Sequence, residues 1–375
     1  MGSSPSDFPP MPTGTDKGSD RPYRRWLSLL LAASVAFRLF YIQWIELAPD
    51  EAYYWTWSRH LQWGYYDHPP LVGFWIKAFT ALAGQSEFGV RVGWVLLTAF
   101  LCWLLYFLGR RVFGSERAGF LAALVMNFSP LASAGAVLAT PDGPLLLFWG
   151  LSILWIHLAV SGKGDSWWYG AGMTFGLGLL SKYSMVLLGP CVLFFLLSYP
   201  GGRKWLGKKE PYLAFLLGLL IFSPVILWNY RHDWMSFRFQ LAHGLEVKKQ
   251  AGLAFFGEYW AGQAGLATPL IFLGILWAMG KSAREGFRRK DGRLLLLFWT
   301  SAPVLLFFAF IYSPIISYVN ARLMGISGQQ IDIPFLKESA FIVSGAKGVD
   351  IWLLLDSVAP ALLIGQAAAR PANFI

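Results

Sequence analysis

The sequence predicts an all-α, polytopic transmembrane protein, with about nine to ten spans and one further helix at the membrane interface. Composition is the first reason: of 375 residues, 56% are hydrophobic and only 14% are charged, against about 25% charged in a soluble domain. The apolar residues also gather in runs that approach the roughly 20 residues needed to cross a bilayer core. The 19 Trp and 15 Tyr suit the same surroundings, because their amphipathic rings settle at headgroup level.

The chain divides into three parts. Residues 1–20 are rich in Pro, Ser, Gly and Asp and are expected to form a disordered cytoplasmic tail. Residues 21–311 hold the transmembrane domain, and residues 312–375 form an atypical C-terminal segment with one weaker candidate span at 351–367. The apolar run at 71–83 is too short to cross the bilayer comfortably and is expected to lie along its surface. The nine principal spans are predicted at 27–46, 92–109, 118–138, 143–160, 168–181, 184–199, 212–229, 264–280 and 294–312.

Basic residues predict the orientation of the spans. The formal net charge is +10, but the Lys and Arg residues form short clusters between apolar runs, which argues against nucleic acid as a partner. With nine spans every cluster falls on one side, and the positive-inside rule makes that side cytoplasmic. We therefore expect a multi-pass protein of the inner (plasma) membrane with a cytoplasmic N-terminus. The clusters lie at 21–25, 110–117, Lys163, 203–209 and 281–293.

Two adjacent carboxylates, Asp50 and Glu51, follow the first span and precede the aromatic pair Tyr53 and Tyr54. A carboxylate at the membrane edge is costly and is therefore a functional candidate. Pro49 ends the preceding helix, which leaves both carboxylates near a helix start, where negative charge is favoured. The alternative is purely structural: an acidic helix start beside an aromatic belt. On the nine-span count this loop is extracytoplasmic.

The same loop continues with Tyr66-Asp67-His68-Pro69-Pro70. A residue before proline is restricted to extended conformations, so the direction of the His68 imidazole is expected to be fixed. The alternative is a simple turn before an interfacial helix.

Three more polar groups fall on the extracytoplasmic side. Asp142 lies in the tight turn between the third and fourth spans, where it could equally cap the fourth span. Lys182 ends the fifth span with nothing acidic beside it in sequence, so it could simply extend its ammonium to the interface. Arg231-His232-Asp233 follows the seventh span.

Together these residues place carboxylates, basic groups and aromatic rings on one side of one membrane. A carboxylate can take the proton of an attacking hydroxyl, and cations can neutralise a departing phosphate. The set therefore suits the transfer of a group from a phosphorylated lipid.

The motifs also carry a family resemblance. The run from Pro49 to Leu71, followed by SEFGVR, TPDGPLLLFW, LLSKYSM and WNYRHDWMSF, resembles glycosyltransferase family 39 over about 22–311. These are polyprenyl-phosphate-sugar-dependent enzymes of the GT-C fold, related to protein O-mannosyltransferases and to lipid A aminoarabinose transferases. The resemblance implies transfer of a sugar, with inversion, from a polyprenyl-phosphate donor to a hydroxyl of a lipid, glycan or protein on the extracytoplasmic side.

The resemblance also implies roles for individual residues. Asp50 and Glu51 would be catalytic, with Asp50 as the general base. His68, Lys182 and Arg231 would lie near the donor phosphate. Some GT-C enzymes use a divalent metal and others do not, so a metal cofactor stays open. The residues expected to shape the site are Tyr53, Tyr54, Tyr66, Asp67, Pro69, Asp142, His232 and Asp233.

The C-terminal part departs from this family. Residues 350–375, with Arg370 and Asn373, resemble a fragment of prolipoprotein diacylglyceryl transferase. The fragment is too short for that activity, which raises the alternative of an inactive truncated or chimeric membrane protein. A divergent ending of the same family is the other explanation.

A further alternative is a transporter of lipids or lipid-linked sugars. Transporters hold their substrates near the bilayer midplane, whereas the polar residues here gather at the outer edge, with Arg38 as the main exception. The pattern favours an enzyme acting at the membrane surface.

Overall fold

The computed structural model describes residues 21–245 and 253–311. Every regular element in these two ranges is a helix. The predicted tail at 1–20, the weaker span at 351–367 and the segment resembling diacylglyceryl transferase at 350–375 lie outside the described residues.

The helices follow one another along the chain with short connections. Their bounds are α1 (Arg21–Tyr41), α2 (Pro49–Arg59), α3 (Leu71–Ala83), α4 (Glu87–Phe113), α5 (Glu116–Phe128), α6 (Pro130–Gly135), α7 (Asp142–Val160), α8 (Trp167–Ser181), η1 (Tyr183–Leu187), α9 (Leu188–Ser198), α10 (Pro200–Arg203), η2 (Lys204–Gly207), α11 (Glu210–Arg231), α12 (Met235–Leu245), α13 (Leu253–Ala267), α14 (Pro269–Arg289), α15 (Gly292–Trp299) and α16 (Ala302–Ile311).

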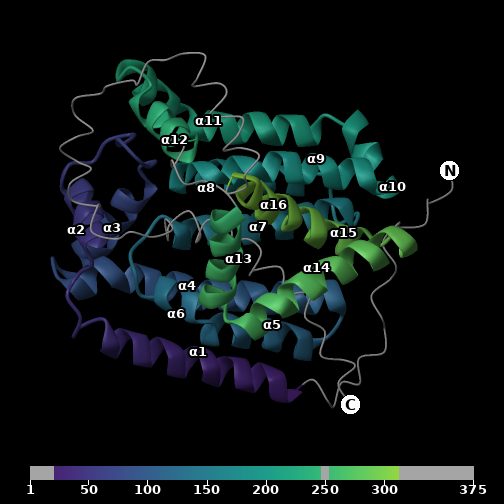
Figure 1. The fold of residues 1–375 in the computed structure, drawn as a ribbon, viewed down its shortest axis with the longest axis horizontal. Coiled ribbons are helices and arrows are strands. Elements are labelled where there is room, and N and C mark those ends of the chain that lie inside the picture. Colours follow the sequence, from purple (N-terminus) through teal and green to yellow (C-terminus); the bar gives the residue numbers. More distant parts are fainter. Residues whose placement is uncertain (1–20, 246–252, 312–375) are drawn as a thin grey trace.

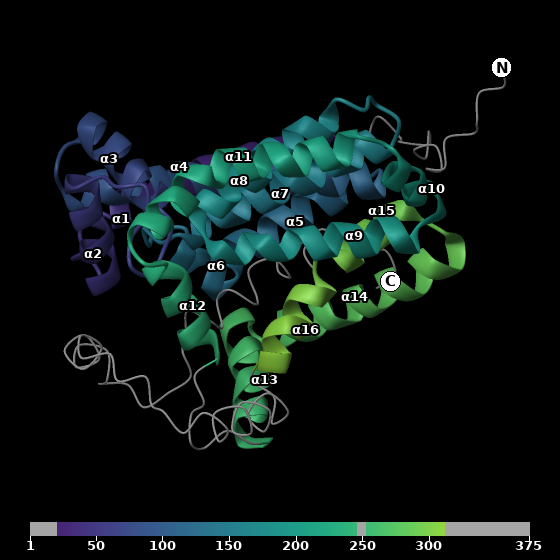
Figure 2. The same ribbon diagram turned by 90° about the horizontal axis from the view of Figure 1, so that it is seen from above.

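The long helices form an elongated bundle. Helices α1, α4, α5, α7, α8, α9 and α11 run along its length, while α2 and α3 close one end (Figure 1). Helix α8 packs most extensively against α7 and α11, and α4 packs against α3, α5 and α7. Seen from above, α12, α13 and part of α16 extend to one side of the bundle (Figure 2).

Each predicted span overlaps one helix or two consecutive helices. The eighth, 264–280, crosses the break between α13 and α14, where the chain bends by 107°. The third covers α5 and α6, which are separated at Ser129, and the ninth covers α15 and α16. The interruption at Lys182 divides 168–199 into α8 and the pair η1–α9. By length and composition, however, only four described helices could cross a bilayer, or up to six if each bent pair counts as one. The chain is an all-helical polytopic membrane protein.

The number of helices able to cross a bilayer is smaller than the nine predicted spans because several helices are short or charged. Helices α5 and α8 contain 13 and 15 residues, fewer than the about 20 that a bilayer core requires. Helix α1 is long enough but begins with three arginines, and Arg38 lies buried in its last turn. The four that satisfy the criterion are α4, α7, α11 and the combined stretch Gly292–Phe310.

Local signals set several helix ends. The Ser86 and Ser115 side chains accept hydrogen bonds from the backbone N–H groups of Gly89 and Ala118, at 3.2 and 3.3 Å, which satisfies donors at the starts of α4 and α5. Gly114, at φ +66°, ends α4 in the left-handed conformation that glycine adopts without strain.

Glycines allow α8 and α11 to approach closely. A Cβ added to Gly172 would lie 2.1 Å from the carbonyl oxygen of Ala214, and one added to Gly176 would lie 2.8 Å from that of Gly218. The backbones are therefore in contact at these positions. Small residues are typical of such close packing between membrane helices.

Two of the longer helices were not predicted as helices. Residues 230–263 are expected to form an extracytoplasmic loop, but they contain α12 and most of α13. Helix α12 is short and carries polar residues, and α13 is mostly apolar but has only 15 residues, fewer than the about 20 of a span, so a search for spans does not reveal them.

The predicted basic clusters meet at the end of the bundle opposite α2 and α3. Glu116 pairs with Arg24 at 2.6 Å and with Arg110 at 3.5 Å, which joins the first two clusters. Lys208 pairs with Asp165 at 2.6 Å, which joins the next two. The end of α14 and the start of α15, which flank the last cluster, lie at this end as well (Figures 1 and 2). The clusters thus share one end of the molecule, as the sequence predicts.

Candidate active site at the α2 end of the bundle

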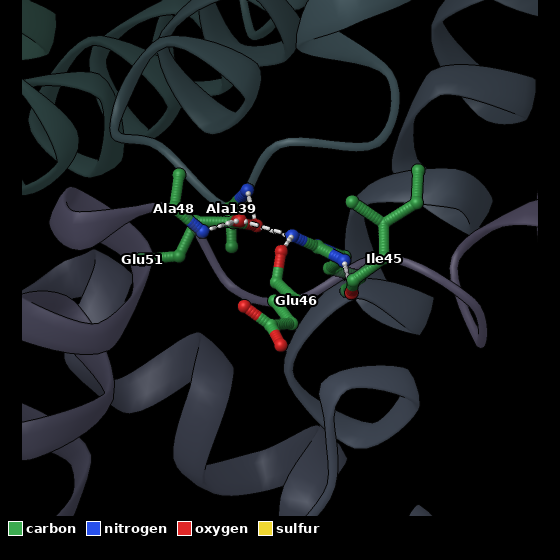
Figure 3. A network of polar contacts seen from close by, with 6 residues as sticks. Ile45, Glu46, Ala48, Glu51 and Ala139 are labelled. Carbon is green, nitrogen blue, oxygen red and sulfur yellow. Dashed lines mark hydrogen bonds and ion pairs between the residues drawn. The ribbon is translucent and has the colours of Figure 1, made fainter.

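Glu51 lies at the centre of a buried polar network (Figure 3). It occupies the first turn of α2, as predicted, and its side chain is fully buried. Arg91, also buried, donates from Nε to Oε1 at 2.9 Å and from Nη2 to Oε2 at 2.5 Å. The backbone N–H groups of Ala48 and Ala139 donate to the two oxygens, each at 2.9 Å. Because a carboxylate offers about four acceptor positions, this network fills the capacity of Glu51.

Arg91 extends the network to the chain that follows α1. Its Nη1 donates to the carbonyl oxygen of Ile45 at 2.6 Å, and its Nη2 donates to that of Glu46 at 2.8 Å. One ion pair therefore fixes the α1–α2 connection, the start of α2, the start of α4 and the turn before α7. Sequence reasoning assigned no role to Arg91, although it lies in the SEFGVR motif.

Asp142 and Lys182 form a second buried ion pair. The Lys182 ammonium donates to Asp142 Oδ1 at 3.0 Å, and both side chains are buried. The neighbouring Ser181 hydroxyl donates to the carbonyl oxygen of Pro141 at 2.6 Å. Two predicted motifs, the turn before α7 and the end of α8, thus form one unit. Lys182 does not simply extend towards the interface, because Asp142, forty residues away in sequence, binds it.

Tyr54 lies among three of the predicted acidic residues. Its side chain is buried, and its ring centroid lies 6.1 Å from that of His68. Burial first, and then the charges of Asp67, Asp50 and Asp142, hold the pKa of the Tyr54 hydroxyl well above its usual value. The three carboxylates therefore surround one neutral phenol at the α2 end of the bundle.

Asp67 is held beside α2 by a hydroxyl group. Tyr53 Oη donates to Asp67 Oδ1 at 3.3 Å. The pKa of Asp67 is raised to about 6, chiefly by burial and to a smaller extent by the charge of Asp50, while the Tyr53 hydrogen bond lowers it. From α12, the Gln240 side chain donates to the backbone carbonyl of Asp67. Asp67 is thus a partly buried carboxyl that can change its protonation state near neutral pH.

Aromatic packing supports this part of the site. Trp57 stacks on Tyr65 with ring centroids 4.0 Å apart, and the rings of Tyr53 and Tyr54 meet Trp57 edge-on, each at 4.9 Å. Tyr66 packs against Phe239 of α12 at 4.6 Å. Pro69 is buried between this segment and α3. The predicted site-shaping residues of the first loop therefore lie together.

The residues after α11 lie at the rim. Arg231, the last residue of α11, and His232 and Asp233, in the turn before α12, are all exposed. The His232 ring stacks on Trp228 at 4.1 Å, and Trp228 Nε1 donates to Gln62 Oε1 at 3.1 Å. The turn thus adjoins the 60–70 segment that carries Asp67 and His68.

Helix α12 adds contacts that the sequence did not reveal. The Ser236 and Tyr183 hydroxyls share a hydrogen bond at 2.7 Å, and Gln240 binds the backbone of Asp67. Ser236 lies in the WNYRHDWMSF motif but was assigned no role, and no sequence signal placed Gln240 at the site. Within residues 21–245 and 253–311, no group of three or more His, Cys, Asp or Glu side chains lies close enough together to hold a metal ion.

Comparison with known proteins identifies the family resemblance. Residues 67–228 match the family model described as dolichyl-phosphate-mannose-protein mannosyltransferase. The resemblance predicted from the motifs is therefore confirmed. The chain is 29% identical to a lipid A galacturonosyltransferase of Rhizobium johnstonii, over 68% of this chain and 53% of that protein. It is 30% identical to an undecaprenyl phosphate-α-4-amino-4-deoxy-L-arabinose arabinosyl transferase of Pseudomonas paraeruginosa, over 61% of this chain and 45% of that protein.

Solved structures share the fold. The apo crystal structure of ArnT from Cupriavidus metallidurans aligns with a TM-score of 0.61 at 18% identity, over 92% of this chain and 59% of that one. Its complex with undecaprenyl phosphate aligns with a TM-score of 0.58 at 18% identity, over 92% and 76%. The archaeal oligosaccharyltransferase AglB from Archaeoglobus fulgidus aligns with a TM-score of 0.51 at 13% identity, over 93% and 57%. The chain thus has an ArnT-like GT-C fold and spans about half the length of the curated relatives it matches.

Proposed function

We propose that the chain is the membrane part of a glycosyltransferase, which moves a sugar from a polyprenyl-phosphate donor to an acceptor hydroxyl with inversion. The observation that carries the proposal is the grouping of Asp50, Asp67 and the Asp142–Lys182 pair around Tyr54. Carboxylates that can accept a proton and a cation that can bind phosphate thus occur together. The family resemblance supplies the reaction to which this chemistry belongs.

Asp50 is the proposed general base. It takes the proton of the acceptor hydroxyl while that oxygen attacks the anomeric carbon from the face opposite the phosphate. Phosphate leaves without needing a proton, so no general acid is required. For Glu51 we propose a positioning role in place of the predicted catalytic one, because Arg91 and two backbone N–H groups already occupy its oxygens.

Lys182, His68 and Arg231 are the proposed partners of the donor phosphate. The bond from Lys182 to Asp142 does not exclude this role, because an ammonium group has three donors. His68 lies beside Tyr54 and Arg231 lies at the exposed rim, so the three would approach the phosphate from different sides. A divalent metal cofactor stays open in this proposal.

The proposed orientation places the site outside the cytoplasm. Its support is the gathering of the basic clusters at the other end of the bundle, which the positive-inside rule assigns to the cytoplasm. In this arrangement the long apolar helices cross the inner membrane, and α3, an apolar helix of 13 residues, lies at the interface. The N-terminus is then cytoplasmic.

The relatives suggest the substrates. Their names refer to undecaprenyl phosphate and to lipid A, so we propose an undecaprenyl-phosphate-linked sugar as donor and a lipid A-type hydroxyl as acceptor. Glycan and protein hydroxyls are the alternative acceptors that the same base could serve.

The test is donor turnover by the purified full chain in detergent. Radiolabelled undecaprenyl-phosphate sugars are offered with lipid A, and the release of undecaprenyl phosphate is followed. Asp50→Asn is expected to abolish release, whereas Asp165→Asn, at the opposite end of the bundle, is expected to retain it. Equal release by wild type and Asp50→Asn would refute the assignment of the base. Movement of the lipid without sugar transfer would refute the enzyme class.

A further inference from the structure

We infer that Asp67 shares the catalytic proton with Asp50, so that a pair of carboxyls, rather than Asp50 alone, takes up the proton of the acceptor. In this role Asp67 is a positioning residue that acts through Asp50. The inference rests on the proposed function. The family resemblance supports that function, but it gives no proton-transfer role to Asp67.

The geometry of α2 brings the two carboxyls to one place. Asp50 and Tyr53 are three residues apart and Asp50 and Tyr54 are four apart, so their side chains lie on neighbouring positions of one helix face. The Tyr53 hydroxyl holds the Asp67 carboxyl at 3.3 Å. Asp67 is therefore fixed against the face that carries Asp50.

The segment around Asp67 has little freedom to move away. Gln240 binds its backbone carbonyl from α12, and the Tyr65 N–H donates to the His68 carbonyl at 3.2 Å. The Tyr65 ring is stacked on Trp57 of α2. The loop is thus anchored on both α2 and α12, and the spacing between the two carboxyls is set by the fold.

Their charges make the sharing of a proton favourable. Two carboxylates near one another in a partly buried site resist full ionisation. Burial is the main cause that raises the pKa of Asp67 to about 6, and the charge of Asp50 acts in the same direction. Such a pair titrates as a unit. The raised pKa values of Tyr53 and Tyr54 keep both phenols protonated, so they act only as donors and neutral neighbours.

The reaction balances without another reagent. The O–H bond of the acceptor breaks, its oxygen bonds to the anomeric carbon, and the bond from that carbon to the phosphate oxygen breaks. Polyprenyl phosphate leaves with the electron pair of that bond. The proton enters the Asp50–Asp67 pair and passes to water after the product departs.

Several other titratable groups face this pair. His68 is the one whose ordinary range, about 6.5, is closest to that of Asp67. The effect of His68 on the pH dependence differs from that of the carboxyls. If the His68 imidazolium binds the phosphate, loss of its proton lowers activity as the pH rises, whereas protonation of the carboxyls lowers activity as the pH falls. The remaining groups are Tyr53 and Tyr54 on α2, Tyr66 beside Asp67, Tyr183 on η1 and Asp142 on α7.

The test is the acidic limb of the pH dependence of kcat/KM. In wild type we expect activity to fall as the pH drops through about 6. In Asp67→Asn the like charge is gone, and the limb should move to lower pH. At pH 5 wild type would then keep about a tenth of its maximum, from the ordinary titration relation, and the variant a larger fraction of its own lower maximum.

Tyr53→Phe should move the limb in the opposite direction. The Tyr53 hydroxyl stabilises the ionised form of Asp67. Its removal should therefore shift the midpoint of the acidic limb to a pH above 6. An Asp67→Asn limb that stays at the wild-type position would overturn the inference, as would displacement of both variants in the same direction. A merely structural role for Asp67 would lower the rate without moving the limb.

A second readout does not depend on turnover. Infrared titration of the purified chain should show a protonated carboxyl band that appears near pH 6 in wild type and in Asp165→Asn, and that is absent from Asp67→Asn. Absence of this band from wild type would overturn the inference even in an active enzyme. A band that behaves as expected in a chain without transfer activity would support the carboxyl pair while refuting the proposed reaction.

Discussion

Replacing Arg91 by methionine tests how the site is held together. The change keeps an apolar stem of similar length but removes the guanidinium, which makes two bonds to Glu51 and two to the backbone carbonyls of Ile45 and Glu46. Glu51 would remain fully buried without its counter-charge. Removing one partner of such a pair costs about 3–5 kcal/mol.

The assay compares Arg91→Met with two other variants in a thermal unfolding series in detergent. Lys208→Met removes one partner of the exposed Lys208–Asp165 pair, and a surface pair is worth only about 0–1 kcal/mol. The double variant Arg91→Met with Glu51→Gln removes both buried charges, so it should be more stable than Arg91→Met alone. The apparent Tm should therefore be highest for Lys208→Met, intermediate for the double variant and lowest for Arg91→Met.

The same series has an activity consequence. Asp50 adjoins Glu51 on α2, so loosening this turn displaces the proposed base, and a displacement of about 1 Å can cost on the order of 100-fold in rate. Below its transition temperature, Arg91→Met should lose transfer activity by about that factor while Lys208→Met does not. If Arg91→Met had the same apparent Tm as Lys208→Met and retained its transfer activity, the positioning role of the Glu51–Arg91 pair would be refuted.

Two further perturbations follow from the packing. Lys182→Met should lower apparent stability by about 3–5 kcal/mol, because it leaves the buried Asp142 carboxylate without its cation, and it should also raise the donor KM; a normal donor KM would argue against phosphate binding by Lys182. Gly172→Leu should separate α8 from α11, because its Cβ would lie 2.1 Å from the Ala214 carbonyl oxygen, at a cost of at least about 1–3 kcal/mol. Gly274→Leu on α14 has open space around it and should change apparent Tm little, so equal effects of the two leucines would contradict this account.

The sequence predicted the helices better than the contacts between them. Apolar runs found every long helix, because burial in lipid or in a bundle selects the same residues. They missed α12, which is short and partly polar, and most of α13, which is apolar but has only 15 residues, fewer than a span requires. The nine-span count treated each apolar run as a span, whereas α5 and α8 are shorter than a bilayer core requires.

The site was predicted residue by residue but not as pairs. Lys182 had no acidic neighbour in sequence, and its partner Asp142 is brought to it by the packing of α7 on α8. Glu51 and Arg91 are forty residues apart and meet in the same way. Hydropathy and local motifs report which residues are unusual, but long-range ion pairs depend on tertiary packing. The role of each predicted site residue remains a prediction.

Four of the carboxylates predicted at the site divide into two kinds. Glu51 and Asp142 each bind a buried cation, Arg91 or Lys182. Asp50 and Asp67 instead act on each other as like charges, which favours proton uptake by the couple.

Helix geometry explains how adjacent residues enter different groups. Successive residues on a helix point about 100° apart, so Glu51 can face α4 and the turn before α7 while Asp50 faces Tyr54 and Asp67. An adjacent acidic pair therefore need not be a catalytic pair. In this fold Glu51, the second member, anchors the helix. The proton-sharing partner of Asp50 is Asp67, seventeen positions later and beyond the end of α2, so the loop after α2 has to bring it back to the start of the helix.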